Sequence, residues 1–136
     1  MTERIKIAVV GAGHVGSTFA YALALAGLAR EIVLVDADRG RAEGEAMDIA
    51  HAVSFTSPVL VTAGDVADTA GAAVTVIAAG AAQRPGETRD DLVARNVGVV
   101  RTLVRQVVQA NPGGMIVMAT NPVDTLTMAA LRESGL

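Results

Sequence analysis

Three glycines near the N-terminus have the spacing of a phosphate-binding turn. Gly11, Gly13 and Gly16 fit the pattern G-x-G-x-x-G in the run GAGHVG, which is informative when a strand precedes it and a helix follows. In such a turn the first glycine allows a tight bend, the second lets the backbone approach a pyrophosphate, and the third lets the helix pack on the strand. Free N–H groups at the start of that helix would bind phosphate oxygens without a lysine.

An acidic residue follows at the distance expected in a dinucleotide site. Asp36 lies about 20 positions after Gly16, where an acid meets the adenosine ribose. Its carboxylate would accept hydrogen bonds from the ribose hydroxyls and repel a 2′-phosphate, which favours NAD over NADP. Arg39 and Arg41 lie nearby and could accommodate that phosphate, and Asp36 could instead cap the following helix. We expect NAD as the cofactor.

The elements that must position these residues follow from the alternation of apolar and amphipathic segments. Strands are predicted at residues 5–10, 31–35, 59–63, 74–78 and 115–119, and helices at residues 15–28, 38–53, 90–110 and 123–134. This order predicts an α/β fold with a doubly wound parallel sheet, strand order 3-2-1-4-5 and helices on both faces. We expect residues 1–136 to form a single domain, with one sheet edge bare after the fifth strand and a functional loop at residues 80–88.

The composition excludes several classes of function. The 136 residues are 51% hydrophobic with a net charge of -3, and the eleven lysines and arginines are scattered, which argues against a nucleic-acid partner. With no cysteine and two histidines, His14 and His51, we expect no disulfide and no metal site. No apolar run reaches the roughly 18 residues of a membrane span and no secretory leader is evident, so we expect a cytoplasmic protein without a membrane partner.

Two further segments carry a family resemblance. Residues 78–92, AAGAAQRPGETRDDL, resemble the active-site loop of the lactate and malate dehydrogenase family, and residues 119–124, ATNPVD, resemble its second signature. Together with the glycine turn, Asp36 and the run GEAMD at residues 44–48, the likeness extends from about residue 5 to the last residue. The family implies hydride transfer between NAD(H) and a small 2-oxo or 2-hydroxy acid.

The resemblance assigns roles to four polar residues. Arg89 matches the loop arginine that polarises the substrate carbonyl, a role that suits a side chain that stays charged when desolvated. Gln83 matches the residue that contacts the variable end of the 2-oxo acid, and Asn121 matches one that hydrogen-bonds the substrate oxygen beside the nicotinamide ribose. Asp124 belongs to the same substrate-binding motif. By the same likeness, further cofactor contacts come from Val15, Arg41, Gly80, Ala81, Thr102, Ala119 and Thr120.

Within the family, the residues at the substrate site allow two alternatives, a lactate dehydrogenase and a malate dehydrogenase. Lactate dehydrogenases carry Gln at the position of Gln83 and malate dehydrogenases carry Arg, because a neutral amide tolerates a methyl group whereas a second carboxylate requires a cation. Asp90 is malate-like, and a shift of the loop by one residue would bring Arg84 into the place of Gln83. Val66 and Ala82 also depart from the residues frequent in lactate dehydrogenases.

Two readings outside that reaction remain. A stand-alone NAD-binding regulatory module would need no loop like residues 83–89, and a methyltransferase could share the glycine turn but not the run NPVD. Lactate dehydrogenases also use a histidine, an aspartate and a second arginine from the second half of the family's sequence. Neither His14 nor His51 replaces that histidine. We therefore expect this chain to bind NAD(H) weakly without turnover, and the full-length form to be a homodimer or homotetramer.

Overall fold

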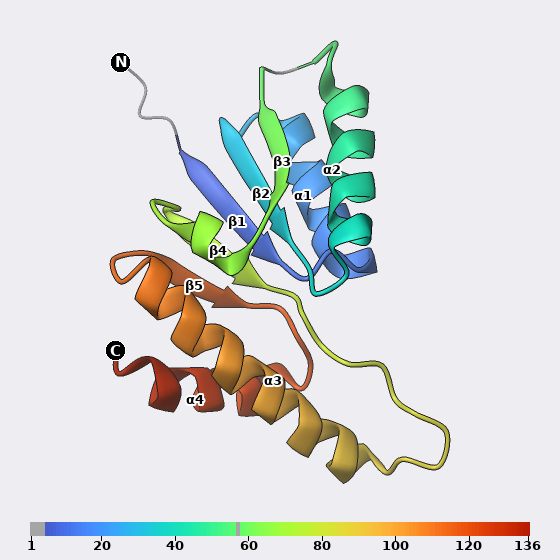
Figure 1. The fold of residues 1–136 in the computed structure, drawn as a ribbon, viewed down its shortest axis with the longest axis vertical. Helices are drawn as coiled ribbons and strands as arrows, with labels where there is room; N and C mark the ends of the chain where they lie inside the picture. The colour runs from blue at the N-terminus through green and yellow to red at the C-terminus, as the bar shows by residue number, and fades with distance from the viewer. Residues whose placement is uncertain (1–4, 57) are drawn as a thin grey trace.

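The computed structural model describes residues 5–56 and 58–136. Its strands form one parallel sheet: Lys6–Val10 (β1), Glu31–Val35 (β2), Leu60–Gly64 (β3), Val74–Ile77 (β4) and Met115–Met118 (β5). They lie in the order β3-β2-β1-β4-β5, which confirms the predicted topology (Figure 1). The helices are His14–Ala26 (α1), Arg39–Val53 (α2), Arg89–Ala110 (α3) and Val123–Ser134 (α4), with a short 3-10 helix at Val66–Thr69 (η1).

Each face of the sheet is covered by its own pair of helices. Because neighbouring residues of a strand point to opposite faces, Val9 packs in the cluster that joins β1, β2 and β3 to α1 and α2. Val10 packs on the other face against Val107 of α3. A further buried cluster joins Ile77 of β4 to α3 and α4 through Val100 and Leu126. Figure 1 shows the two helix pairs on either side of the sheet, as expected of a doubly wound fold.

The predicted bounds of the strands and α-helices agree with the structure to within two residues, and one element was missed. Helix α1 ends at Ala26 because Gly27 adopts the left-handed conformation, with φ 64°, and its N–H bonds to carbonyls of the last turn. Helix η1 was not predicted. Its start is fixed by a reciprocal pair of hydrogen bonds between Asp65 and Asp68, a capping arrangement that stabilises even a single short turn.

The β5 edge of the sheet is covered on one face. Ile116 and Met118 pack against the α3 and α4 cluster, whereas Met115 and Val117 point to the opposite face and are 64% and 41% exposed. In the order of strands β5 has β4 as its one neighbour, as predicted for this edge. Among residues 5–56 and 58–136, no helix combines the length and apolar character of a membrane span.

Candidate dinucleotide site

The three glycines of the turn between β1 and α1 have different surroundings. Gly11 has φ 105°, a conformation that L side chains rarely adopt, and a side chain there would collide with the backbone of Ala79. A Cβ atom on Gly16 would overlap the carbonyl oxygen of Gly11. A Cβ on Gly13, in contrast, would meet no atom within 4 Å. Gly11 and Gly16 are therefore required by packing, whereas Gly13 leaves open space beside the backbone.

The N-terminus of α1 is prepared for an anion. Its N-cap is Gly13, which provides no side-chain hydrogen bond, and the first turn holds no acidic residue. In α3, by comparison, the side chain of Thr88 accepts the N–H of Asp91, and two acids occupy the first turn. The first turn of α1 thus has no carboxylate of its own, which leaves its N–H groups and the positive end of its dipole available to a phosphate group.

Asp36 is bonded to the glycine turn. Its Oδ2 accepts the backbone N–H of Ala12 at 2.8 Å, and its Oδ1 accepts the N–H of Asp38 at 2.8 Å. The N-cap of α2 is Asp38, whose Oδ1 accepts the N–H of Arg41 at 3.1 Å. The helix-capping alternative for Asp36 is therefore wrong. Each carboxylate oxygen has a second lone pair, which leaves Asp36 able to accept further hydrogen bonds.

A cleft of about 1280 Å³ lies beyond the carboxyl ends of β1, β2 and β4. In open parallel sheets ligands bind in this crevice, where the strand order reverses. Seven of the residues predicted to bind the cofactor line the cleft: Gly11, Gly13, Asp36, Arg41, Gly80, Ala81 and Thr102. The structure thus brings together residues from separate segments of the sequence.

Part of the wall was not predicted from the sequence. The side of α3 that faces the cleft contributes Arg95, Val99, Gln106 and Gln109 in addition to Thr102. These positions recur at helical spacing, so Thr102 and the predicted helix together could have identified them. The turn of η1 adds Asp65, Val66 and Ala67, and no comparable sequence pattern pointed to these three residues.

The other predicted site residues lie outside the lining of the cleft. Gly16 is buried beneath the glycine turn and Val15 is exposed on α1. Ala119 and Thr120 follow β5 and are half-buried. Gln83, Arg89, Asn121 and Asp124 are exposed: the first lies in the β4–α3 loop, Arg89 is the first residue of α3, and the last two lie after β5.

The two family signatures meet at the carboxyl ends of β4 and β5. The hydroxyl of Thr120 donates to the carbonyl of Ala79 at 2.7 Å, and a Cβ on Gly80 would approach Thr120 Cγ2 to 2.7 Å. Asn96, which is only 4% exposed, accepts the N–H of Ala81 through Oδ1 at 2.8 Å. The start of the loop is thereby attached both to β5 and to α3.

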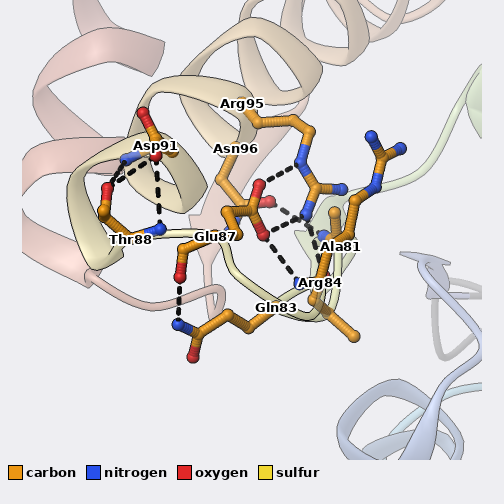
Figure 2. A network of polar contacts seen from close by, with 9 residues as sticks. Ala81, Gln83, Arg84, Glu87, Thr88, Asp91, Arg95 and Asn96 are labelled. Atoms are coloured by element: carbon orange, nitrogen blue, oxygen red, sulfur yellow. Dashed lines mark hydrogen bonds and ion pairs between the residues drawn. The ribbon is translucent and has the colours of Figure 1, made fainter.

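The loop at residues 80–88 extends away from the sheet (Figure 1) and is held by an ion pair. Arg95 donates to Oε1 and Oε2 of Glu87 at 2.9 and 2.8 Å, and to the carbonyl of Ala82 at 2.8 Å (Figure 2). Oε2 of Glu87 also accepts the N–H of Arg84 at 2.8 Å. These bonds, foremost that from Arg95, lower the pKa of Glu87, and the bond to Glu87 raises the pKa of Arg95.

Gln83 and Arg84 point in different directions from this loop. The Gln83 amide Nε2 donates to the carbonyl of Glu87 at 2.8 Å, while the guanidinium of Arg84 extends to the other side of the loop (Figure 2). In this arrangement of the loop, the side chain of Arg84 does not occupy the place of the Gln83 side chain.

These features define a dinucleotide-binding domain of the Rossmann type. They are the parallel sheet, the glycine turn, the carboxylate bonded to that turn, and the cleft at the switch between β1 and β4. Residues 5–136 match the family model described as lactate/malate dehydrogenase, NAD binding domain. The chain belongs to this family, and NAD is the cofactor of the domain.

Individual relatives include both activities. L-lactate dehydrogenase 1 of Clostridium acetobutylicum is 47% identical over 135 residues, which are 99% of this chain and 43% of that protein. The ligand-bound crystal structure of the minor L-lactate dehydrogenase from Enterococcus mundtii has a TM-score of 0.94 at 39% identity, over 97% of this chain and 42% of the other. Malate dehydrogenase from Archaeoglobus fulgidus in complex with NADH has a TM-score of 0.90 at 39% identity, over 97% and 46%. The chain therefore spans less than half the length of these relatives.

Proposed function

We propose that residues 1–136 form a single domain that binds NAD(H) in the cleft as the cofactor-binding part of an L-lactate dehydrogenase. The observation that supports this most directly is the hydrogen bond from the glycine turn to Asp36, a residue that lines the cleft: the N–H of Ala12 donates to Oδ2 at 2.8 Å. It joins the residue expected at the ribose to the turn expected at the pyrophosphate.

The residues present fit the cofactor. The open space beside Gly13 allows the pyrophosphate to approach the backbone, and the uncapped N-terminus of α1 supplies N–H donors and a positive dipole. The remaining lone pairs of Asp36 accept the ribose hydroxyls. NADH supplies the hydride of the reaction. The protein's contribution in this segment is to hold the dinucleotide along the cleft, between the turn and the side of α3 that lines it.

For the substrate, we propose the roles that the family resemblance assigns. Arg89 stabilises the negative charge that develops on the carbonyl oxygen, and Asn121 donates to the same oxygen. Gln83 contacts the variable end of the 2-oxo acid, and Asp124 belongs to the substrate-binding motif. The contact of Thr120 with Ala79 and Gly80 supports this assignment, because it brings the two signatures side by side at the carboxyl end of the sheet.

Pyruvate is the favoured substrate because Gln83 is neutral and Arg84 extends away from it. A malate dehydrogenase is the second candidate, which the presence of Asp90 and the likeness to the NADH-bound malate dehydrogenase favour. In a complete enzyme that contains this domain, the ratio of kcat/KM for pyruvate and oxaloacetate separates the two. A preference for oxaloacetate would show that the enzyme is a malate dehydrogenase and not a lactate dehydrogenase.

We propose that residues 1–136 alone bind the cofactor without reducing a 2-oxo acid. The reaction needs a proton donor, which commonly contributes about 10²–10⁴-fold to the rate. His14 is exposed at the start of α1 and His51 is exposed near the end of α2, and neither is among the residues that line the cleft. The general acid of the family would come from its second half, and the complete enzyme would be a cytoplasmic homo-oligomer.

The test is titration of the purified chain with NADH, followed by nicotinamide fluorescence and calorimetry, together with a pyruvate-reduction assay. We expect saturable 1:1 binding and no turnover above buffer. Absence of NADH binding would refute the proposed cofactor site. Pyruvate reduction by this chain would refute the proposal that it lacks a general acid. Tight binding by a stable monomer would favour the regulatory-module alternative.

A further inference from the structure

An ion-pair cluster stands at the adenosine end of the cleft. Arg39, at the start of α2, donates from Nε to Glu43 Oε1 at 3.0 Å and from NH1 to Asp65 Oδ1 at 2.9 Å. Asp65 precedes η1 and lines the same cleft as Asp36. The guanidinium of Arg39 is therefore bonded to a residue that lines the cleft, and Arg39 stands three residues after the carboxylate expected to meet the adenosine ribose.

Arg39 is the kind of residue that could accept a 2′-phosphate. An arginine close to the acid after the second strand accommodates the additional phosphate of NADP in dinucleotide folds, and its planar fork matches phosphate oxygens. Here both carboxylates occupy that fork. The hydrogen bond to Glu43 and the charge of Asp65 raise the pKa of Arg39, so the side chain is a fully charged but engaged cation.

The charges around Arg39 also disfavour a 2′-phosphate. Arg41 also lines the cleft, but Asp36 and Asp38 lie beside it. With Arg39 neutralised by Glu43 and Asp65, carboxylates outnumber free cations at this end of the cleft. A 2′-phosphate would bring about two further negative charges into that environment, whereas the free 2′-hydroxyl of NAD brings none.

We propose that Asp65 and Glu43 are specificity-determining residues, which exclude a 2′-phosphorylated dinucleotide by holding Arg39 in ion pairs. The inference rests on the proposed binding of NAD(H) in this cleft and extends it. Asp36 acts against the phosphate directly. Asp65 and Glu43 act by withholding Arg39, a cation that could compensate it.

The experiment measures dissociation constants for NADH and NADPH, by fluorescence at low ionic strength, for the purified chain and its variants. In the double variant Glu43→Gln with Asp65→Asn the carboxamides keep the shape but lose the charges, and Arg39 is released. We expect the ratio of NADPH affinity to NADH affinity to rise about tenfold, the scale of one charge–phosphate contact near a protein surface. The gain should diminish as salt is added.

Three further variants make the test specific. Adding Arg39→Gln to the double variant should lower the ratio back toward the wild-type value, whereas Arg39→Gln in the wild type should change it less than about twofold, since both bonded nitrogens of the arginine already face carboxylates there. Asp48→Asn, which removes one carboxylate charge where the double variant removes two, at an exposed position farther along α2, should also leave the ratio unchanged. Circular dichroism confirms that every variant is folded.

The outcomes distinguish a failure of this inference from a failure of the proposed NAD(H) site. An unchanged ratio in the double variant, with NADH still bound, overturns the role of Asp65 and Glu43 alone. A raised ratio that persists without Arg39 shows that the lost carboxylates repelled the phosphate by themselves and also overturns the inference. Binding of neither dinucleotide by the wild type overturns both the inference and the proposed cofactor site.

Discussion

The carboxylate of Asp36 and the backbone N–H of Ala12 are joined by a hydrogen bond of 2.8 Å, although 24 positions separate them in the sequence. The bond connects the end of β2 to the glycine turn after β1, and the N–H of Gly11 reinforces the junction by donating to Val35 at 2.7 Å. The part of the site expected at the ribose and the part expected at the pyrophosphate are thus joined by the protein's own hydrogen bonds.

The substitution Asp36→Asn tests this unit. The carboxamide has one acceptor oxygen where the carboxylate has two, so its NH₂ group would have to oppose at least one of the two N–H donors that Asp36 accepts. Hydrogen bonds to charged groups contribute about 1.5–3 kcal/mol, so we expect a loss of unfolding free energy of about 1.5 kcal/mol and about tenfold weaker NADH binding. Urea denaturation and fluorescence titration measure the two effects. Asp38→Asn is the matched control, because asparagine is an equally good N-cap.

Gly13→Ala separates ligand binding from folding. The added Cβ meets no protein atom within 4 Å, so the thermal stability should stay close to that of the wild type. NADH binding should weaken at least about tenfold, because the methyl group occupies the space through which the pyrophosphate approaches. Gly44→Ala, also in open space but in the middle of α2, should leave binding unchanged and stabilise by about 0.5–1 kcal/mol. Equal binding by Gly13→Ala and wild type would contradict the position assigned to the pyrophosphate.

The buried hydroxyl of Thr75 lowers the stability of the fold. Its Oγ1 is buried on β4 with no hydrogen-bond partner among the described residues, and a buried unsatisfied hydroxyl costs about 1–3 kcal/mol. We expect Thr75→Val to raise the free energy of unfolding by about 1 kcal/mol in urea denaturation. Thr69→Val provides the contrast, because the equally buried hydroxyl of Thr69 donates to Val66 at 2.7 Å. That variant should lose about 1 kcal/mol.

The ion pair between Glu87 and Arg95 should govern the order of the β4–α3 loop. In Glu87→Gln the charge is lost, and the N–H of Arg84 loses its carboxylate acceptor. Hydrogen exchange of the Arg84 amide, followed by NMR, should become roughly five- to tenfold faster. Asp90→Asn, an exposed change of the same charge at the start of α3, should leave that rate within about twofold, because it removes no contact of the loop. Equal rates in wild type and Glu87→Gln would show that the loop is held by other contacts.

Acid should loosen α4 from α3. Arg101 and Arg105 on α3 both bond to Glu133 on α4, and these hydrogen bonds lower the pKa of Glu133 below its ordinary value of 4.5. The unfolded chain therefore binds this proton more readily, so the contribution to stability is complete above about pH 4.5 and is lost as pH falls through the lower, folded-state pKa. Thermal unfolding between about pH 7 and pH 3 should show this decline. In Glu133→Gln the decline should be smaller, because the titrating carboxylate is absent.

The sequence alone determined the strands, the four α-helices, the sheet order and the chemistry of the turn. Short apolar runs that alternate with helical segments leave few topologies other than a parallel sheet, since crossovers are almost always right-handed. The glycine spacing and Asp36 predicted the place of the site because their roles depend on local backbone geometry and on a fixed position after a strand.

Only the tertiary structure decided which polar groups are partners. Arg39 could have paired with any of several nearby acids, and its selection of Glu43 and Asp65 depends on how α2 packs beside η1. The same holds for the cleft wall formed by Gln106 and Gln109, which requires the orientation of α3 about its axis. Local patterns fix the type of an element, but long-range contacts fix its rotation and its neighbours. Charge partners and cleft walls consist of those contacts.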